Sequence, residues 1–594
     1  MLVKSNKNLT NPEIAELLRS VAAAYQISDP NGNRFQIIAY SKAADAIEHL
    51  SSEAKDIWEE GKLTDVSGIG GSIAGHLGDI FKTGHSKHFD QLLGELPSSV
   101  FELIKVPGIG PKTAFRFAHE LHISNRKPIE DLKKKAEGGM VSKMEGMGDK
   151  SEDEIIQNIK EYLQKPQERM LLPRALELAN EVIGWIKKDD SVKQIEQLGS
   201  ARRRASTVGD IDIGVATTNP KKVLEHFTKY PNATRVIEKG DVTSSILLPG
   251  NIQVDLLAIK PDAWGSTLQH FTGSKHHNIA LREFSLKKNL SLSEKGIKNL
   301  KTGTMHKYAT EEEFYKALGL EWIPPELRED MGEIKAAREG KLPKVVQLEE
   351  IKGDLQIHSD FDIETSHDVG ASSMEDIISK AGELNYEYVA LTEHNPSQKG
   401  HSEKDIIDIL KHKKDKIEQV MSSVKSSMPK LFNGLEVDIL PDGKLPVSDN
   451  ALELLDFCLV SIHSSFTQSR KAQTERVLRG LDHPKVKIFA HPTGRRINHR
   501  EGVELDWPRI FEFALKNNKW IEINADPMRL DLPDFLVKEA VDKGVLLSMG
   551  TDAHHVDGMD NMEWAIDVAQ RGWAESQNIV NTRSLKEFEK LLQL

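Results

Sequence analysis

The sequence predicts a multidomain protein with an α-helical amino-terminal region, an α+β middle region and a (βα) barrel at the carboxyl end. Three observations predict this order. A glycine turn pattern recurs before residue 150, acids alternate with apolar residues near the middle, and apolar runs after residue 353 end in His, Glu or Asp. The 594 residues suffice for about four domains of roughly 150 residues each.

The amino-terminal pattern is hydrophobe-x-Gly-hydrophobe-Gly, and a helical run follows each copy. It occurs at 66–70, 106–110 and 144–148. Two glycines in such a turn let backbone N–H groups at a helix start bind phosphate oxygens without reading bases. One copy is equally consistent with a plain turn between helices, whereas three copies resemble helix-hairpin-helix modules that bind the DNA backbone. The predicted DNA-binding residues are Gly68, Gly70, Gly108, Gly110 and Lys112.

In the middle region, a Gly-Ser turn at 199–200 precedes a strand pattern at 210–215. Apolar residues alternate there with Asp210 and Asp212, which places both carboxylates on the solvent-facing side of the strand. Asp255 follows a Pro-Gly-Asn turn and is expected on a neighbouring strand. Converging carboxylates repel one another unless divalent cations lie between them, and their hard oxygens favour Mg²⁺ or Mn²⁺. This acid trio (Asp210, Asp212, Asp255) predicts a two-metal site for phosphoryl chemistry on a nucleotide.

The spacing from the Gly-Ser turn to Asp-x-Asp, followed by Phe271-Thr272-Gly273-Ser274 and Asn278, resembles the palm of the family-X DNA polymerases. The resemblance extends through residue 330 and implies a polymerase that fills short gaps in base-excision repair. It makes the acid trio the catalytic Mg²⁺ ligands, and gapped or primer-template DNA and a dNTP the partners. It also implies that nucleotide is bound by Gly199, Ser200, Arg203, His270, Phe271, Gly273, Asn278 and Arg282.

Several positions depart from the family pattern. His270 stands where the family usually has a tyrosine beside the sugar, which bears on discrimination between ribose and deoxyribose. Gln253 replaces an arginine that animal members often place next to the third Asp. Family members with lyase activity use a Schiff-base lysine after the first hairpin, where this chain has Ser72 and His76. We therefore expect weak or absent lyase activity, unless another lysine substitutes, the candidates being Lys42 and Lys82.

These patterns and the family resemblance together imply six consecutive segments. Thr310 is expected to cap a helix of the fourth segment, since acids follow it. In chain order the segments are a helix-hairpin-helix domain (1–90), fingers with a second helix-hairpin-helix (91–170), the nucleotidyltransferase palm (171–285), a thumb (286–330), a charged linker (331–350) and a metal-dependent hydrolase domain (351–594).

From residue 353 onward, short apolar runs alternate with helical stretches, which is typical of βα units that form a parallel barrel. Chemistry in such barrels gathers at the carboxyl ends of the strands. One His after a strand is usually a polar loop residue, but here successive strand ends carry His, Glu or Asp. Imidazole and carboxylate ligands suit Zn²⁺ or Mn²⁺. The candidate ligands are His358, His367, His394, Glu436, His463, His491, Asp552 and His554.

This half resembles the PHP (polymerase and histidinol phosphatase) domain, and its place behind a family-X core matches bacterial and archaeal polymerases with that tail. The resemblance implies hydrolysis of phosphodiesters or phosphomonoesters, including 3′–5′ exonuclease activity. It divides the ligands into a first metal site with His358, Glu436 and Asp552, a second with Glu436, His463 and His491, and a third with His394 and His554. An insertion that contains Asp360, Asp362 and His367-Asp368 leaves the completing ligand of the third site open, and we favour His367.

Two alternatives remain open at this stage. Gln356 occupies the place of a usual PHP histidine and Glu393 that of a common Asp, so the carboxy-terminal half is alternatively a degenerate scaffold that braces the polymerase or recruits a partner. The middle region is alternatively a nucleotidyltransferase for RNA or a small acceptor, against which the three hairpins and the Phe271-Thr272-Gly273 motif argue.

The composition is compatible with an enzyme whose DNA binding is confined to grooves of its surface. The net charge of −12 argues against a surface coated in basic residues. A single cysteine, Cys458, excludes an internal disulfide and a thiolate zinc site. The start of the chain does not resemble a signal peptide, and no apolar run approaches the roughly 18 residues that cross a bilayer. We expect a cytoplasmic, nucleoid-associated monomer without membrane contact.

Overall fold

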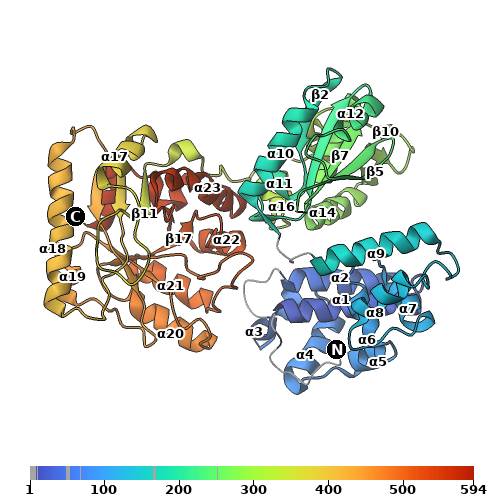
Figure 1. Ribbon diagram of the computed structural model, residues 1–594, viewed down its shortest axis with the longest axis horizontal. Coiled ribbons are helices and arrows are strands. Elements are labelled where there is room, and N and C mark those ends of the chain that lie inside the picture. The colour runs from blue at the N-terminus through green and yellow to red at the C-terminus, as the bar shows by residue number, and fades with distance from the viewer. Residues whose placement is uncertain are drawn as a thin grey trace. The chain divides into compact units, whose positions relative to one another are not determined.

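The computed structural model describes residues 9, 11–48, 54–59, 61–66, 68–164, 169–250 and 252–593. The chain divides into two compact units, which we call unit 1 (Met1–Glu168) and unit 2 (Arg169–Leu594). In its described part, unit 1 is helical. Unit 2 holds a mixed sheet near its start and a parallel barrel at its carboxyl end (Figure 1).

Unit 1 contains two helical cores. The first buries apolar side chains such as Ile14, Leu18 and Leu77, and the second buries Leu103, Phe117 and others. The helices of the first core are α1 (Asn11–Ser28), α2 (Arg34–Glu48), α3 (Ala54–Glu59), α4 (Gly71–Thr83) and α5 (Lys87–Gly94). Those of the second are α6 (Ser98–Leu103), α7 (Pro111–Glu120), α8 (Pro128–Glu137) and α9 (Asp149–Gln164).

The three glycine turns each lead directly into a helix, namely α4, α7 and α9. The first glycine of each turn is left-handed, with φ of 98° at Gly68, 79° at Gly108 and 76° at Gly146. Gly70 and Gly110 then adopt extended backbone as the N-caps of α4 and α7. Because L side chains are strained at positive φ, the first glycine lets the chain turn so that the next helix presents its free N–H groups.

The mixed sheet of unit 2 has the strand order β2-β4-β7-β6-β5. Its alternating apolar side chains, including Ile211, Ile213 and Val254, are buried against helices, as the pattern predicts. Helices α10 (Leu172–Ile186) and α12 (Pro220–Phe227) pack on the sheet (Figure 1). The strands are β2 (Val192–Gln197), β4 (Ile211–Thr217), β5 (Arg235–Lys239), β6 (Thr243–Leu248) and β7 (Ile252–Ile259). The short strands β1 (Met170–Leu171) and β3 (Thr207–Val208) pair beside the short helix α11 (Gly199–Arg202).

A smaller α+β part follows the sheet. Thr310 caps α15 as expected, because its side chain accepts a hydrogen bond from the Glu313 N–H. This part consists of α13 (Trp264–Thr272), α14 (Lys275–Leu286), the three strands β8 (Leu290–Ser293), β9 (Gly296–Asn299) and β10 (Met305–His306), and α15 (Glu311–Leu318).

The stretch 331–350, expected as a charged linker, contains helix α16 (Glu333–Glu339). Glu333 is 1% exposed and lies 2.5 Å from Nδ1 of His277 on α14. The segment therefore packs on the preceding part, because one buried carboxylate and the apolar Ile334 and Ala337 give it a face that its charged composition conceals.

The carboxy-terminal barrel consists of eight parallel strands in two hydrogen-bonded runs. Bridges between Ile357 and Ala553 and between His394 and Glu436 join the runs. The strands are β11 (Gly353–Ile357), β12 (Tyr388–Leu391), β13 (Lys430–Asn433), β14 (Glu436–Asp438), β15 (Cys458–Ser461), β16 (Val486–Phe489), β17 (Trp520–Asn524) and β18 (Leu547–Gly550). The helices are α17 (Met374–Glu383), α18 (Glu403–Ser423), α19 (Asp449–Leu452), α20 (Arg470–Leu481), α21 (Trp507–Asn517), α22 (Asp534–Lys543), α23 (Met562–Arg571) and α24 (Leu585–Leu592).

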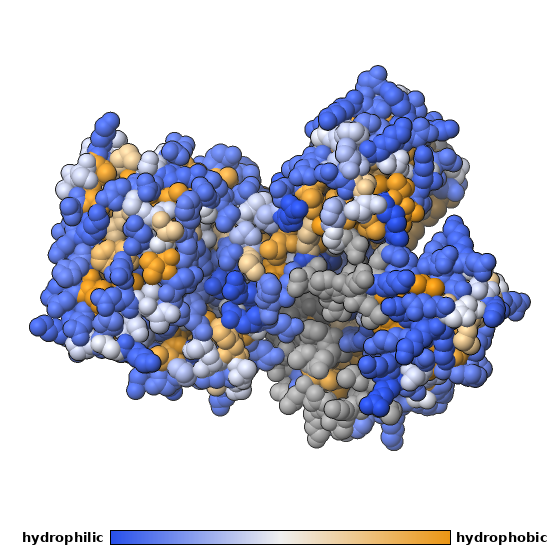
Figure 2. All heavy atoms as spheres, viewed as in Figure 1, coloured by the Kyte–Doolittle hydropathy of each residue, from blue (hydrophilic) through white to orange (hydrophobic). Residues whose placement is uncertain are grey.

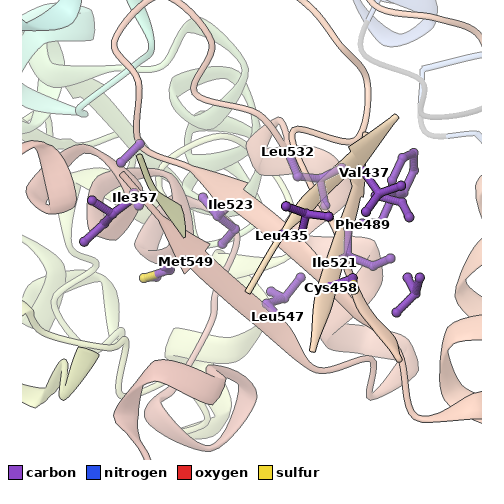
Figure 3. Packing of buried hydrophobic residues seen from close by; sticks show 14 of the residues in the cluster. Ile357, Leu435, Val437, Cys458, Phe489, Ile521, Ile523, Leu532, Leu547 and Met549 are labelled. Atoms are coloured by element: carbon purple, nitrogen blue, oxygen red, sulfur yellow. The ribbon is translucent and has the colours of Figure 1, made fainter. Parts of the chain in front are cut away.

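Two apolar layers hold the barrel together. Strand residues such as Val437, Phe489 and Ile523 belong to a large buried cluster with the surrounding helices (Figure 3). A second cluster includes Phe588 of α24, whose ring stacks on Tyr388 at a centroid distance of 4.5 Å. The barrel is thus a packed core, and its polar residues collect at the strand ends.

Hydrophilic residues cover most of the face shown in Figure 2, with hydrophobic residues scattered among them. Among the described residues, no helix combines the length and apolar character that spanning a bilayer requires.

Candidate active sites

The acid trio gathers at β4 and β7, two neighbouring inner strands of the mixed sheet. Asp212 on β4 and Asp255 on β7 are register partners on neighbouring parallel strands, and Asp210 immediately precedes β4. Burial and the charges of Asp255 and Asp210 raise the pKa of Asp212 to about 6, although Arg203 opposes this shift. Such mutual repulsion is what divalent cations relieve, so the donor set fits the two-metal site that the sequence predicts.

The turn that holds Ser200 lies against the same carboxylates. Gly199 has φ of 57°, and a Cβ there would lie 2.6 Å from Oδ2 of Asp212. The Leu198 N–H donates to the Asp212 carbonyl at 2.8 Å, which fixes the turn to β4. Only glycine permits this approach, and it brings the start of α11 next to the acid trio.

Arg203 is anchored at the end of this turn. Its Nη1 donates to the Thr272 carbonyl at 2.5 Å and its Nε to Oε1 of Glu329 at 2.8 Å. A Cβ on Gly273 would lie 3.2 Å from Arg203 Nη1, so this glycine also keeps the guanidinium in place. The remaining N–H groups of Arg203 are available to an anion beside the trio.

The other predicted nucleotide-binding residues lie on helices α13 and α14 or between them. Asn278 Nδ2 donates to the His270 carbonyl at 2.7 Å, and the His270 and Phe271 rings meet edge to face with centroids 4.9 Å apart. Burial and the charge of Arg282 lower the pKa of His270. Phe271 is 38% exposed, so an aromatic face is open beside a neutral imidazole.

In the barrel, Glu436 is the centre of a buried polar cluster. Its Oε1 lies 2.9 Å from His491 Nε2 and 3.3 Å from His463 Nε2. Its Oε2 lies 3.4 Å from His358 Nε2 and 3.5 Å from His394 Nδ1. Glu436 is 1% exposed, and one carboxylate therefore faces four imidazoles at the strand ends.

Among the residues that the structure describes, four groups of side chains place their ligand atoms within 4.8 Å of one another. Two of them coincide with the ligand sets expected for the first and second metals. The groups are His358, Glu436 and Asp552; Glu436, His463 and His491; His358, His394 and His554; and His367, His394 and His463.

The ring nitrogens of this cluster fit a metal centre. Both nitrogens of His358, Nδ1 of His394 and Nε2 of His554 are buried without a hydrogen-bond partner in the described structure. Burial alone would lower the pKa of His358, but the neighbouring Asp552 and Glu436 carboxylates, 3.2 and 3.4 Å from its Nε2, raise it to about 10. A divalent cation would neutralise the negative charge of these carboxylates and would bind the unpaired imidazole nitrogens.

Comparison with known proteins finds family matches in both halves of the chain. Family matches cover a helix-hairpin-helix domain at residues 9–86, a SAM-like helix-hairpin-helix tandem at 100–161, a DNA polymerase beta thumb at 267–329 and a PHP domain at 354–526. The DNA polymerase/3'-5' exonuclease PolX of Bacillus subtilis (strain 168) is 33% identical over 583 residues, which cover 98% of this chain and 99% of that protein.

The chain belongs to the family-X DNA polymerases that carry a carboxy-terminal PHP domain. The expected family, the multidomain fold class and the assignment as an enzyme are thereby confirmed. The PHP half also resembles a probable phosphatase of Thermoanaerobacter sp. (strain X514), 26% identical over 34% of this chain and 81% of that protein. A probable phosphatase of Syntrophotalea carbinolica is 23% identical over 38% of this chain and 90% of that protein.

Two carboxylates that we did not assign as ligands, Asp368 of the insertion and Asp438, lie against histidines of the PHP cluster in this family-X polymerase. Asp368 lies 3.6 Å from His394 Nε2 and 3.4 Å from His554 Nε2, whereas His367, favoured for the third metal, turns to Asp438 Oδ2 at 3.0 Å. Asp438 Oδ1 also lies 2.7 Å from His463 Nδ1. The structure thus groups His367 with His394 of the third ligand set and His463 of the second, and it places Asp368 between the two histidines of the third.

The departures from the PHP pattern have direct structural effects. Gln356 Nε2 donates to Glu436 Oε2 at 2.9 Å, so an amide occupies the position from which a histidine would bind the first metal. Glu393 is 2% exposed and forms a buried ion pair with Lys413. Glu393 is therefore bound to a lysine instead of facing the cluster.

The predicted DNA-binding residues of this polymerase lie in unit 1. Gly70 and Gly110 have open space where a Cβ would stand, and Lys112 is exposed on α7. His76, at the position of the family's lyase lysine, stacks on His88 with centroids 4.6 Å apart. Burial and the His88 charge lower the pKa of His76.

Proposed function

We propose that this polymerase fills short gaps in DNA at the acid trio and removes nucleotides from DNA 3′ ends at the PHP cluster. The observation that carries the first activity is the register pairing of Asp212 with Asp255 beside the Gly199 turn. Gapped or primer-template DNA and a dNTP would be the substrates, in the cytoplasm at the nucleoid. Both sites lie in one chain, which supports action as a monomer.

In the polymerase site, Asp210, Asp212 and Asp255 would hold Mg²⁺. Bound there, the cations would favour ionisation of the primer 3′ hydroxyl and neutralise the triphosphate. Ser200 and Arg203 would bind the departing phosphates, and Phe271 would pack beside the sugar of the incoming nucleotide. Gln253 Nε2 donates to both Asp255 oxygens at 3.0 Å, so this amide and a metal ion would share the lone pairs of the carboxylate.

In the PHP cluster, the histidines, Glu436 and Asp552 would hold Zn²⁺ or Mn²⁺. Such ions would supply a hydroxide at neutral pH that attacks phosphorus. Glu436 faces both of the expected ligand sets that share it, and this geometry supports hydrolysis at a two-metal centre.

Two substitutions test the division of labour. Asp255→Ala should abolish nucleotide addition on a gapped duplex while 3′-end hydrolysis continues. His463→Ala should have the opposite effect, with addition retained and hydrolysis lost. Retained addition in Asp255→Ala would overturn the palm assignment, and equal loss of both activities in either variant would indicate one composite site.

A scaffold role for the PHP domain is the second candidate, favoured by one observation, the Gln356 amide that replaces a ligand at Glu436. Metal content of the full-length protein separates the candidates. A hydrolase should retain stoichiometric transition metal after dialysis and lose it in Glu436→Ala, with nucleotide addition as the control for folding. Absence of metal in the parent protein would support the scaffold.

A further inference from the structure

One helix of the PHP domain contacts the polymerase half of unit 2 next to Arg203. Trp564 of α23 packs against a small core formed by α10, α11 and β3, including Leu172 and Ala201. Arg571 ends the same helix and is 6% exposed. The barrel thus presents a buried arginine to the turn that carries the proposed triphosphate-binding residues.

Arg571 is bound from both sides. Its Nη1 donates to the Arg203 carbonyl at 2.7 Å and to Glu329 Oε1 at 2.9 Å. Its Nε donates to Asp534 Oδ2 at 2.8 Å, and its Nη2 lies 2.5 Å from the same oxygen. Asp534 begins α22 within the barrel, so the arginine is oriented by its own domain and reaches across to the other.

Glu329 joins this arginine to the nucleotide site. The same Oε1 accepts hydrogen bonds from Arg203 Nε at 2.8 Å and from Arg571 Nη1. The Glu329 side chain is 19% exposed and that of Arg203 14%, so solvent screens the network little. Along the network, charges alternate from Arg203 through Glu329 and Arg571 to Asp534.

We propose that Arg571 is a positioning residue for the polymerase reaction, which holds Glu329 and the Arg203 backbone so that the Arg203 guanidinium faces the triphosphate. The proposal rests on the proposed function of Arg203. With Arg571 present, Glu329 divides its charge between two arginines, and Arg203 keeps N–H groups for an anion. Without Arg571, Glu329 loses the partner that holds it and the turn loses a donor at its carbonyl, so the Arg203 guanidinium is no longer oriented toward the nucleotide.

The test is single-nucleotide addition on gapped DNA, with KM for the dNTP and kcat measured separately. A phosphorothioate at the primer end keeps hydrolysis from interfering. Arg571→Ala should raise KM roughly tenfold with kcat within about twofold, because it weakens ground-state and transition-state binding alike. Arg571→Lys, which keeps the charge, should recover most of the loss. Arg509→Ala, which removes an exposed arginine paired with Glu475 at 2.9 Å on the barrel surface, should leave KM unchanged.

Retained metal content and 3′-end hydrolysis in Arg571→Ala would show that the barrel is folded. Where that variant misfolds, Glu329→Gln supplies the same test from the polymerase side and should raise KM similarly. In folded protein, the double variant should cost less than the sum of the two single effects, because both act on one network. An unchanged KM in the folded variants overturns the proposal, as does a kcat loss without a KM change.

Arg203→Ala distinguishes a failure of the proposed role of Arg203 from a failure of the positioning role of Arg571. A normal KM for the dNTP in Arg203→Ala would refute the proposed role of Arg203 itself. A raised KM in Arg203→Ala beside a normal KM in Arg571→Ala would refute the positioning role of Arg571 alone.

Discussion

Single residues decide how strongly the PHP cluster can hold metal. Gln356 supplies an amide that donates to Glu436 Oε2 and accepts from Asn524 Nδ2 at 3.2 Å. The oxygen and an N–H group of the Gln356 amide thus both have hydrogen-bond partners, and the replacement leaves no unpaired polar group there. A carboxylate that accepts this hydrogen bond has one electron pair fewer for a cation, and the first ligand set retains only one imidazole, that of His358.

We expect Gln356→His to strengthen metal binding at the first ligand set. An imidazole there adds a nitrogen ligand and removes the competing hydrogen bond to Glu436, and changes of this kind alter affinity by roughly 10- to 100-fold. Titration of the metal-free protein with Mn²⁺ checks the affinity, and nucleotide addition serves as the control for folding. Gln473→His, at a buried glutamine of α20 outside the cluster, should not increase affinity.

Asp438 and Asp368 were not assigned to this cluster from the sequence, and the reasons differ between the two residues. Asp438 stands two positions after Glu436 on β14, so strand alternation places both on one side and could have revealed it. Asp368 sits outside any strand, in an insertion, and its position between His394 and His554 depends on the path of that loop. No local period encodes such a path. The placement of Asp212 beside Asp255, by contrast, follows from two alternating strands and was predicted.

At the scale of elements, the glycine turns connect backbone geometry to DNA binding. We expect Gly108→Ala to weaken DNA binding severalfold, because φ is 79° and a Cβ would lie 2.9 Å from Asn158 Nδ2, which displaces the N–H groups of α7. Gly139→Ala is the matched control, since its φ of 71° imposes similar strain in open space outside the hairpin. Both variants should lose about 1 kcal/mol of stability, but only Gly108→Ala should lose affinity in a salt-controlled binding titration.

Helix α23 carries a largely but not fully buried carboxylate, the 14% exposed side chain of Asp567, whose ionisation opposes folding. Burial is the main reason that the pKa of Asp567 rises to about 7, against an opposing effect from Arg204. An acid with a raised folded-state pKa stabilises the protein below its unfolded pKa of 3.8 and loses that contribution as pH rises through 7.

Asp567→Asn should therefore increase the free energy of unfolding by about 1–2 kcal/mol at pH 8, with the difference vanishing near pH 4. Thermal unfolding of both proteins across this range measures the effect. Asp449→Asn, at a side chain that is 92% exposed, should show no such pH dependence. A gain from Asp567→Asn that is equal at pH 4 and pH 8 would exclude ionisation as the cause.

Long-range pairing of elements was the part of the fold that the sequence left open. The hydrophobic periods predicted the strands around the acid trio and the barrel strands that end in ligands. They did not predict that α16 would pack on α14 through Glu333 and His277, or that α23 would reach Arg203. Both contacts are hydrogen bonds between polar groups far apart in the chain, and a buried hydrogen bond leaves no apolar period to recognise.

At the scale of the whole molecule, DNA backbone binding and chemistry are assigned to separate units. The three glycine turns lie in unit 1, whereas the acid trio, Arg203, Arg571 and the PHP cluster lie in unit 2. The Glu329 network joins the Arg203 turn to helices α22 and α23 of the barrel within unit 2, and the hairpins belong to a unit with its own apolar cores.

A chain that begins at Arg169 should therefore fold, bind the same amount of metal per molecule and add nucleotides, but with KM for gapped DNA raised at least about tenfold. The reason is that the hairpin N–H groups and Lys112, which neutralise phosphates, are removed, and each lost phosphate contact also reduces the salt dependence of binding. KM for the dNTP should stay near that of the full-length protein, because Arg203 and its partners are retained.

Full-length Lys112→Ala should shift the salt slope in the same direction by about one unit. An unchanged KM for DNA in the shortened chain would mean that unit 2 binds the duplex by itself, and would contradict the assignment of backbone binding to the hairpins.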